Sequence, residues 1–222
     1  MFIPLKDENP TKTYPYITVS IIIVNILFFF YALFQGKMGI NNIAYKFGAI
    51  PYTYSHFPFH LFPNALPPPF TLITSQFVHG GFFHIAGNML YLWIFGNNIE
   101  DVIGHFRFLI YYIVAGIIAS FAHIIASPSS TIPMIGASGA IAGIMGAYMV
   151  LFPRAKILTL IFFIIIIQIV RIPAIFVLGF WFFIQLLMST NPNSHVAWFA
   201  HIGGFLFGVV TIKWMIKRKR YI

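Results

Sequence analysis

The sequence predicts an all-α, polytopic membrane protein that folds as one six-transmembrane-helix bundle over residues 1–222. The composition is 59% hydrophobic and only 8% charged, which leaves too little polar surface to cover a water-exposed domain of this size. Apolar runs of about the twenty residues needed to cross a bilayer recur along the chain, and basic residues flank them. These patterns favour a multi-pass protein of the cell membrane whose main contact is lipid.

Six segments have the length and the apolar character of membrane spans. We place them at residues 16–34, 79–98, 106–126, 137–152, 173–189 and 196–215. The first span follows a short charged stretch. It is longer than the core of a signal peptide, and no small-residue cleavage site follows it, so we interpret it as part of the mature protein.

The loop between the first and second spans, residues 35–73, is predicted to lie on the outer side. Six prolines are spread through this loop among phenylalanines and tyrosines. Aromatic side chains of this kind partition into the membrane interface, so we expect the loop to rest partly in it.

The fourth and sixth spans carry small residues at helical spacing. Gly139 and Gly143 lie four residues apart in the fourth span, and Gly204 and Gly208 do so in the sixth. Small side chains at this spacing let two helix backbones approach closely. We therefore expect these two spans to pack against each other.

The apolar run from 157 to 187 is too long for one span, and it contains Arg171 and Pro173. We predict that 157–170 lies at the inner interface and that the fifth span begins near Pro173, since proline suits the first turn of a helix. The alternative gives 157–170 a span of its own. Seven spans would move the carboxy-terminal basic cluster outside, against the charge rule.

The placement of lysine and arginine sets the orientation. With six spans and both termini inside, eleven basic residues lie on the inner side, and the outer side keeps only Lys37 and Lys46. This asymmetry predicts cytoplasmic termini. Because the basic residues flank apolar segments, the net charge of +9 indicates anionic lipid as a partner rather than nucleic acid. There is no cysteine, which excludes disulfides and thiolate metal sites.

Polar residues stand near the heads of the second, fourth and sixth spans, which all run from outside to inside in this topology. They are His84 and Asn88, Ser138, and His201. At about 1.5 Å rise per residue, all four fall in the outer third of the membrane. Polar side chains at such depth are costly and usually mark a functional site. Their common depth predicts one shared site near the outer face.

Serine and histidine in this setting are the nucleophile and the base that a serine hydrolase needs. We predict Ser138 as the nucleophile and His201 as its general base and acid. The backbone N–H of Ser138, the amide of Asn88 and the imidazole of His84 are candidate oxyanion donors. No third, carboxylate member is expected, because every acid lies toward the inner side: Asp7, Glu8, Glu100 and Asp101.

Two other classes of function compete with this hypothesis. His79, His84 and His201 could bind zinc, but the sequence has no His-Glu-x-x-His motif, so we predict no metal. A transporter would favour internal repeats or charged residues at the midplane, and we find neither. His79 is predicted to be interfacial. No role is predicted for the other histidines: His56, His60, His105, His123 and His195.

The motifs that contain these residues resemble those of the rhomboid family of intramembrane serine proteases. Gly136-Ala137-Ser138-Gly139 is similar to the nucleophile motif of the family. Ala200-His201 followed by Gly204 and Gly208 is similar to its base helix, and His84-xxx-Asn88 to its oxyanion helix. The order of the motifs and the six-span layout also match, so the resemblance covers nearly the whole chain.

The resemblance implies an endopeptidase that cuts transmembrane protein substrates in or beside their membrane segments, without a cofactor. It assigns supporting roles to Gly136, Gly139 and Gly204, and a structural role to Glu100. It also makes the fifth span, with the segment 189–195, a gate. The alternative function is an inactive rhomboid-like module that binds transmembrane helices. The sequence does not predict an oligomeric state.

Two positions depart from the family pattern. Many members carry a Trp-Arg pair in the first outer loop, where this chain has Phe70-Thr71-Leu72. Some members place a tyrosine one turn after the serine to support the histidine ring, and here that position is Ala142. The His201 ring must therefore be supported by another side chain.

Overall fold

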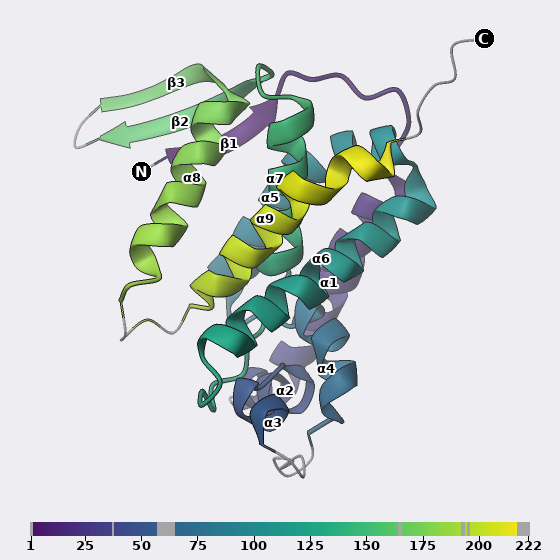
Figure 1. Ribbon diagram of the computed structural model, residues 1–222, viewed down its shortest axis with the longest axis vertical. Helices are drawn as coiled ribbons and strands as arrows, with labels where there is room; N and C mark the ends of the chain where they lie inside the picture. The colour runs from purple at the N-terminus through teal and green to yellow at the C-terminus, as the bar shows by residue number, and fades with distance from the viewer. Residues whose placement is uncertain are drawn as a thin grey trace.

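The structure, a computed structural model, describes residues 2–36, 38–56, 65–163, 166–191, 194 and 196–216. Six long helices form a bundle (Figure 1). They are α1 (Tyr16–Phe34), α5 (Phe82–Ile103), α6 (His105–Ala126), α7 (Ser138–Leu151), α8 (Ala174–Met188) and α9 (Trp198–Met215). Each corresponds to one predicted span, with bounds that differ by a few residues at most, and the helical character of the bundle is confirmed.

Three of these helices, α1, α6 and α9, are long and apolar enough to cross a membrane. The helices α7 and α8 are apolar but shorter. Large apolar side chains cover the outer faces of the bundle, as on α1, where Leu27 is 64% exposed, and on α8, where Phe176 is 67% exposed. Such surfaces suit a lipid environment. That all six helices span the membrane stays a prediction.

The centre of the bundle is α7, which is buried from Gly139 to Tyr148 without interruption. A helix that is apolar all round is stable only when neighbours surround it. Its glycines and alanines allow this, because they let α6 and α9 approach its backbone. The first residue of this buried helix is Ser138.

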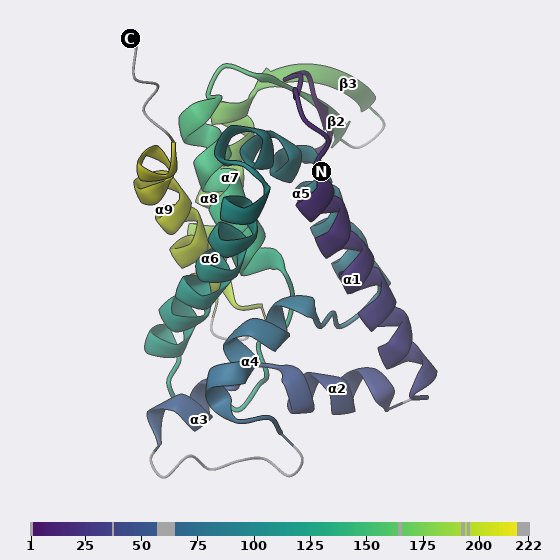
Figure 2. The same ribbon diagram turned by 90° about the vertical axis from the view of Figure 1, so that its right-hand side faces the viewer.

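The predicted outer loop, 35–73, is largely helical where it is described. It contains α2 (Gly39–Phe47), α3 (Pro51–Ser55) and α4 (Pro68–Thr74), followed by a short 3-10 helix, Ser75–Phe77. Residues 57–64 lie outside the described part of the chain. Prolines in the first turn start α3 and α4. Both views place these short helices together at one end of the bundle (Figures 1 and 2).

A three-stranded antiparallel sheet covers the opposite end (Figure 2). It consists of β1 (Phe2–Asp7), β2 (Lys156–Phe163) and β3 (Ile166–Pro173), in the order β1-β2-β3. In the segment 157–170, predicted as an interfacial stretch, the described residues 157–163 and 166–170 are thus strand, and α8 begins directly after Pro173 as predicted. This sheet was not predicted from the sequence.

Polar contacts attach the sheet to the bundle. The carboxylate of Asp7 at the end of β1 accepts hydrogen bonds from the Asn98 amide on α5, at 2.7 Å, and from the Tyr148 hydroxyl on α7, at 3.0 Å. Glu8 pairs with Arg171 on β3 at 2.6 Å. The amino-terminal strand therefore connects α5, α7 and the β2–β3 pair.

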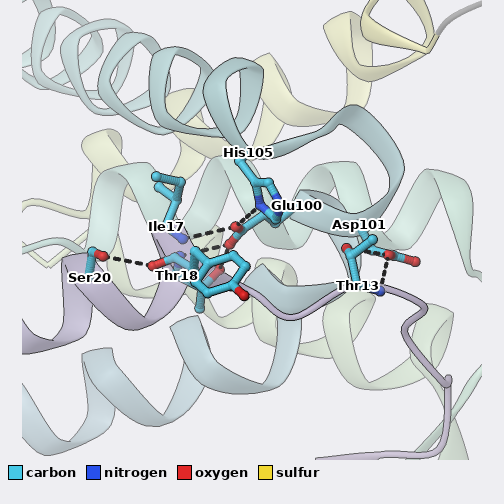
Figure 3. Close-up of polar contacts among 8 residues, drawn as sticks. Thr13, Ile17, Thr18, Ser20, Glu100, Asp101 and His105 are labelled. Carbon is cyan, nitrogen blue, oxygen red and sulfur yellow. Dashed lines mark hydrogen bonds and ion pairs between the residues drawn. The ribbon is translucent and has the colours of Figure 1, made fainter.

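Glu100, near the end of α5, holds the start of α1 (Figure 3). Its fully buried carboxylate accepts the backbone N–H groups of Ile17 and Thr18, at 2.9 and 2.7 Å, and the Thr18 hydroxyl at 2.7 Å. His105 contacts the same carboxylate at 2.5 Å. The first N–H groups of a helix lack partners within it, so Glu100 caps α1 from a neighbouring helix. This is the structural role that the family resemblance implied.

Candidate active site

Ser138 stands at the junction of a loop and a buried helix. It is the first residue of α7, and the preceding Gly136 has a φ of +117°, a conformation that other residues rarely adopt. A Cβ on Gly136 would also come within 2.7 Å of Nε2 of His84. Glycine is therefore required here for both conformation and space, and it lets the loop turn so that Ser138 begins α7 beside His84.

His201 lies in the first turn of α9 and meets the serine. Its Nε2 is 2.8 Å from Oγ of Ser138, a hydrogen-bond distance. The close crossing of α7 and α9 makes this possible, since a Cβ on Gly204 would overlap the carbonyl of Gly139. The predicted packing of the two glycine-containing helices is thus observed, and it brings the predicted pair together.

The other ring nitrogen of His201 also has a partner. Nδ1 lies 2.8 Å from Oε1 of Gln185 on α8. The rings of Trp181 and Trp198 lie 5.9 and 5.8 Å from the imidazole, measured between centroids. These three side chains support the His201 ring, a role that some family members give to a tyrosine at the position of Ala142.

A cavity of about 740 Å³ opens over the pair, and a volume of this size could admit an extended peptide segment. Ser138, His201 and His84 all line it, together with α2 residues, His123 of α6 and the segment 132–135. The structure thus brings three of the four predicted site residues to one cavity.

Asn88, the fourth predicted residue, is placed differently. It lies one helical turn beyond His84 on α5, is only 8% exposed, and is absent from the described lining of the cavity. Its side-chain amide donates to the backbone carbonyl of His84 at 2.8 Å. In this arrangement the Asn88 amide is bonded to the backbone of its own helix, α5, and not to Ser138.

The comparisons with known proteins identify the family. The family model of the rhomboid domain matches residues 68–218, which is more than half of the chain and includes every residue of the predicted site. The chain belongs to the rhomboid family. The match, together with the apolar helices, makes it a multi-pass membrane protein.

Three relatives illustrate the similarity. Rhomboid protease GluP of Bacillus subtilis is 33% identical over 209 residues, which cover 91% of this chain and 34% of GluP. Rhomboid protein 1, mitochondrial, of Saccharomyces cerevisiae is 32% identical over 152 residues, 63% of this chain and 40% of the yeast protein. Putative rhomboid protease YdcA of B. subtilis is 29% identical over 160 residues, 68% of this chain and 70% of YdcA. The chain thus aligns with well under half the length of the first two.

Within this rhomboid, His84 is oriented as a hydrogen-bond donor toward the site. The backbone N–H of Gly80 points at its Nδ1, at 3.3 Å. A neutral imidazole that accepts at Nδ1 carries its proton on Nε2. Nε2 is the atom that faces Gly136, next to Ser138. This geometry fits the predicted oxyanion role of His84 better than that of Asn88.

Two further histidines lie close to the site. His79, predicted to be interfacial, is 1% exposed; its ring lies 5.1 Å from that of His84, and its Nε2 accepts the backbone N–H of Ala137 at 3.5 Å. It therefore packs inside the protein beneath the loop that carries Ser138. His123, to which no role was given, lies in the last turn of α6 and lines the cavity.

The zinc hypothesis gains no support from the geometry. Among the described residues, no group of three or more histidine, aspartate or glutamate side chains is placed to hold a metal ion. His79 and His84 are neighbours, but His201 pairs with Ser138 and Gln185 instead.

Proposed function

We propose that this rhomboid is an intramembrane serine endopeptidase that hydrolyses peptide bonds in or next to the transmembrane segments of membrane proteins. The observation that carries the proposal is the 2.8 Å contact between Oγ of Ser138 and Nε2 of His201, both of which line the cavity. The names of GluP and YdcA, which are called proteases, support it.

The chemistry follows from the positions of these atoms. Nε2 of His201 removes the hydroxyl proton as Oγ of Ser138 attacks the substrate carbonyl carbon. The tetrahedral intermediate collapses when His201 returns that proton to the leaving amine, which breaks the C–N bond. A water molecule then attacks the acyl-serine with the same base, releasing the acid and restoring Ser138. The cavity provides the space for that water.

The negative oxygen of the intermediate needs donors that are already in place. The backbone N–H of Ser138 opens α7 and is one of the helix N–H groups without an intrahelical partner. Nε2–H of His84 is the second donor in our proposal. The loss of one such donor typically raises the barrier by about 3 kcal/mol. Asn88 would need to turn its amide from the His84 carbonyl to serve as a third.

The proposed topology has six spans, cytoplasmic termini and a cavity that opens toward the outer face. The 14 residues of α7 extend about 21 Å, less than the roughly 30 Å of a hydrocarbon core. A helix this short cannot reach both surfaces, which supports a serine recessed below the outer one. The sheet at the opposite end, where Lys6 and Arg171 lie, would face the cytoplasm.

The test is a cleavage assay with a reporter transmembrane substrate in liposomes. Ser138→Ala should abolish cleavage without changing the fold or membrane insertion. A fluorophosphonate should label wild-type protein at Ser138 and should not label His201→Ala. A chelator should have no effect. Continued cutting by Ser138→Ala would refute the nucleophile assignment, and a folded wild type that neither cuts nor labels would favour the inactive helix-binding module.

A further inference from the structure

We infer that Gln185 of α8 is a positioning residue that fixes the tautomer of His201, so that the base functions only while α8 packs against α9. The inference rests on the proposed protease function and deepens it. Neither the sequence motifs nor the family match assigns a role to Gln185. Its support is a chain of hydrogen bonds that runs from the α8 backbone to Ser138.

The first step fixes the orientation of the glutamine amide. Nε2 of Gln185 donates to the backbone carbonyl of Trp181, one turn earlier on α8, at 2.9 Å. Reversing the amide would point its carbonyl oxygen at another carbonyl oxygen, which is repulsive. The amide oxygen of Gln185 must therefore face the other way, toward His201.

The second step fixes the histidine. Oε1 of Gln185 lies 2.8 Å from Nδ1 of His201, and an amide oxygen can only accept a hydrogen bond. Nδ1 must then carry the proton of the neutral ring, which leaves the lone pair on Nε2. That lone pair faces the Ser138 hydroxyl at 2.8 Å. In the opposite tautomer Nε2 would be protonated and could not accept the serine proton.

The place of Gln185 on its helix supports a specific role. Among the described residues of α8, only Ala174, Leu178 and Gln185 are buried, and the glutamine is 4% exposed. Phe176, Phe180 and Phe183 of the same helix are exposed. A buried amide on an otherwise apolar, outward-facing helix is costly unless both of its ends are bonded. Here both ends are bonded, one of them to His201.

The linkage to α8 has a mechanical consequence. Leu178 and Gln185 lie two turns apart on the face of α8 that meets the bundle, and Trp181 packs against His201 and Phe205 from the same helix. Movement of α8 away from α9 would remove the Nδ1 acceptor and the Trp181 ring together, leaving only Trp198 of α9 beside the imidazole. His201 would then be free to change tautomer or to rotate away from Ser138.

A matched pair of variants tests the inference. Gln185→Met keeps the length and approximate shape of the side chain but provides no acceptor. Gln185→Glu keeps an oxygen acceptor and adds a charge. Fluorophosphonate labelling of Ser138 and reporter cleavage are measured from pH 5 to 9, with thermal unfolding as the check on folding, and Gln168→Met on exposed β3 serves as the control.

We expect Gln185→Met to label and cleave about 10- to 100-fold more slowly than wild type, by analogy with metal sites that lose the hydrogen-bonding partner orienting a histidine ligand. Gln185→Glu should recover most of that rate, with the acidic limb of its pH profile moved up by about one unit, because a carboxylate stabilises the protonated ring. The titratable groups that line the cavity with His201, namely His84, His123 and Tyr45, are unchanged in both variants.

The outcomes separate this inference from the proposed function. If a folded wild-type protein neither labels nor cleaves, the protease function itself fails. If wild type is active and a folded Gln185→Met variant matches its rate and pH profile, the positioning role is refuted while the protease function stands. Loss of rate in Gln185→Met with recovery in Gln185→Glu supports the role.

Discussion

Gly204 of α9 lies directly against the backbone carbonyl of Gly139 on α7, with no space for a side chain between them. Gly208 meets the carbonyl of Gly143 one turn further along in the same way. These contacts set the separation of the two helices whose first turns carry Ser138 and His201. The distance within the proposed dyad is therefore determined by residues that have no side chain of their own.

Gly204→Ala should separate the two helices and weaken catalysis. One added methyl group must displace a backbone carbonyl, at a cost of about 1–3 kcal/mol of stability for overpacking. A displacement of about 1 Å at the dyad can lower the rate by about 100-fold. Reporter cleavage and thermal unfolding measure the two effects.

Gly179→Ala on α8 is the matched control, because an added Cβ there meets no atom within 4 Å. That variant should be as stable as wild type or slightly more so, since alanine favours the helix over glycine. Wild-type cleavage by Gly204→Ala would mean that the crossing of α7 and α9 does not control the dyad.

Gly136→Ala should impair the oxyanion site while the dyad stays intact. The new Cβ would lie 2.7 Å from Nε2 of His84, and the φ of +117° would strain the alanine by about 1–3 kcal/mol. Displacement of the donor should lower kcat by about 100- to 1000-fold. The measurement is reporter kinetics, with Gly87→Ala on α5 as a control in open space. An unchanged kcat would argue against His84 as a donor.

The bundle and the contact between Ser138 and His201 could be predicted from the sequence because both are signalled by local composition. Long apolar runs fixed the helices, and α1 has the predicted bounds, Tyr16–Phe34. Ser138 and His201 could be paired in advance because each stands near the head of a glycine-rich helix, and small residues at that spacing imply close packing. Those two facts predicted that the side chains come within hydrogen-bond reach, and the structure places them 2.8 Å apart.

The features that were missed depend on tertiary context. The segment 157–170 is almost continuously apolar, and a run of that kind shows no alternation that would identify a strand. Only the pairing of β2 with β1 and β3 reveals the sheet. Gln185 could have been noticed as an amide within an apolar span, which is a functional signal in itself. Its partner could not be named, because the rotation of α8 about its axis is set by packing.

Glu100→Ala should destabilise the protein without touching the proposed catalytic residues. The buried carboxylate accepts two backbone N–H groups of α1 and the Thr18 hydroxyl, and removing it leaves those donors without their acceptor. Hydrogen bonds to a charged group contribute about 1.5–3 kcal/mol each, so we expect a loss of at least about 3 kcal/mol. Thermal or denaturant unfolding in detergent measures it.

Glu8→Ala provides the contrast for that experiment. It breaks the Glu8–Arg171 pair, in which both side chains are substantially exposed, and exposed ion pairs contribute about 0–1 kcal/mol. If the two variants lowered the free energy of unfolding equally, the buried hydrogen bonds from α1 to Glu100 would contribute no more to stability than an exposed ion pair does.

Asp7 should make stability depend on pH. Burial raises the pKa of this carboxyl group above its ordinary value of 3.8, despite the hydrogen bonds from Tyr148 and Asn98. The folded protein therefore keeps a proton that the unfolded chain releases. The stabilising contribution of the protonated form is complete below pH 3.8 and is lost as pH rises through the folded pKa.

Asp7→Asn removes this titration and keeps the shape of the side chain. Melting temperatures of both proteins in detergent, measured in steps from pH 3.5 to 7, should show wild type losing stability relative to Asp7→Asn as pH rises above about 4. The difference should become constant above the folded pKa, since further ionisation no longer distinguishes the two states. A difference that is the same at every pH would mean that Asp7 titrates alike in both states, and that β1 is attached to α5 and α7 without a cost for burying the charge.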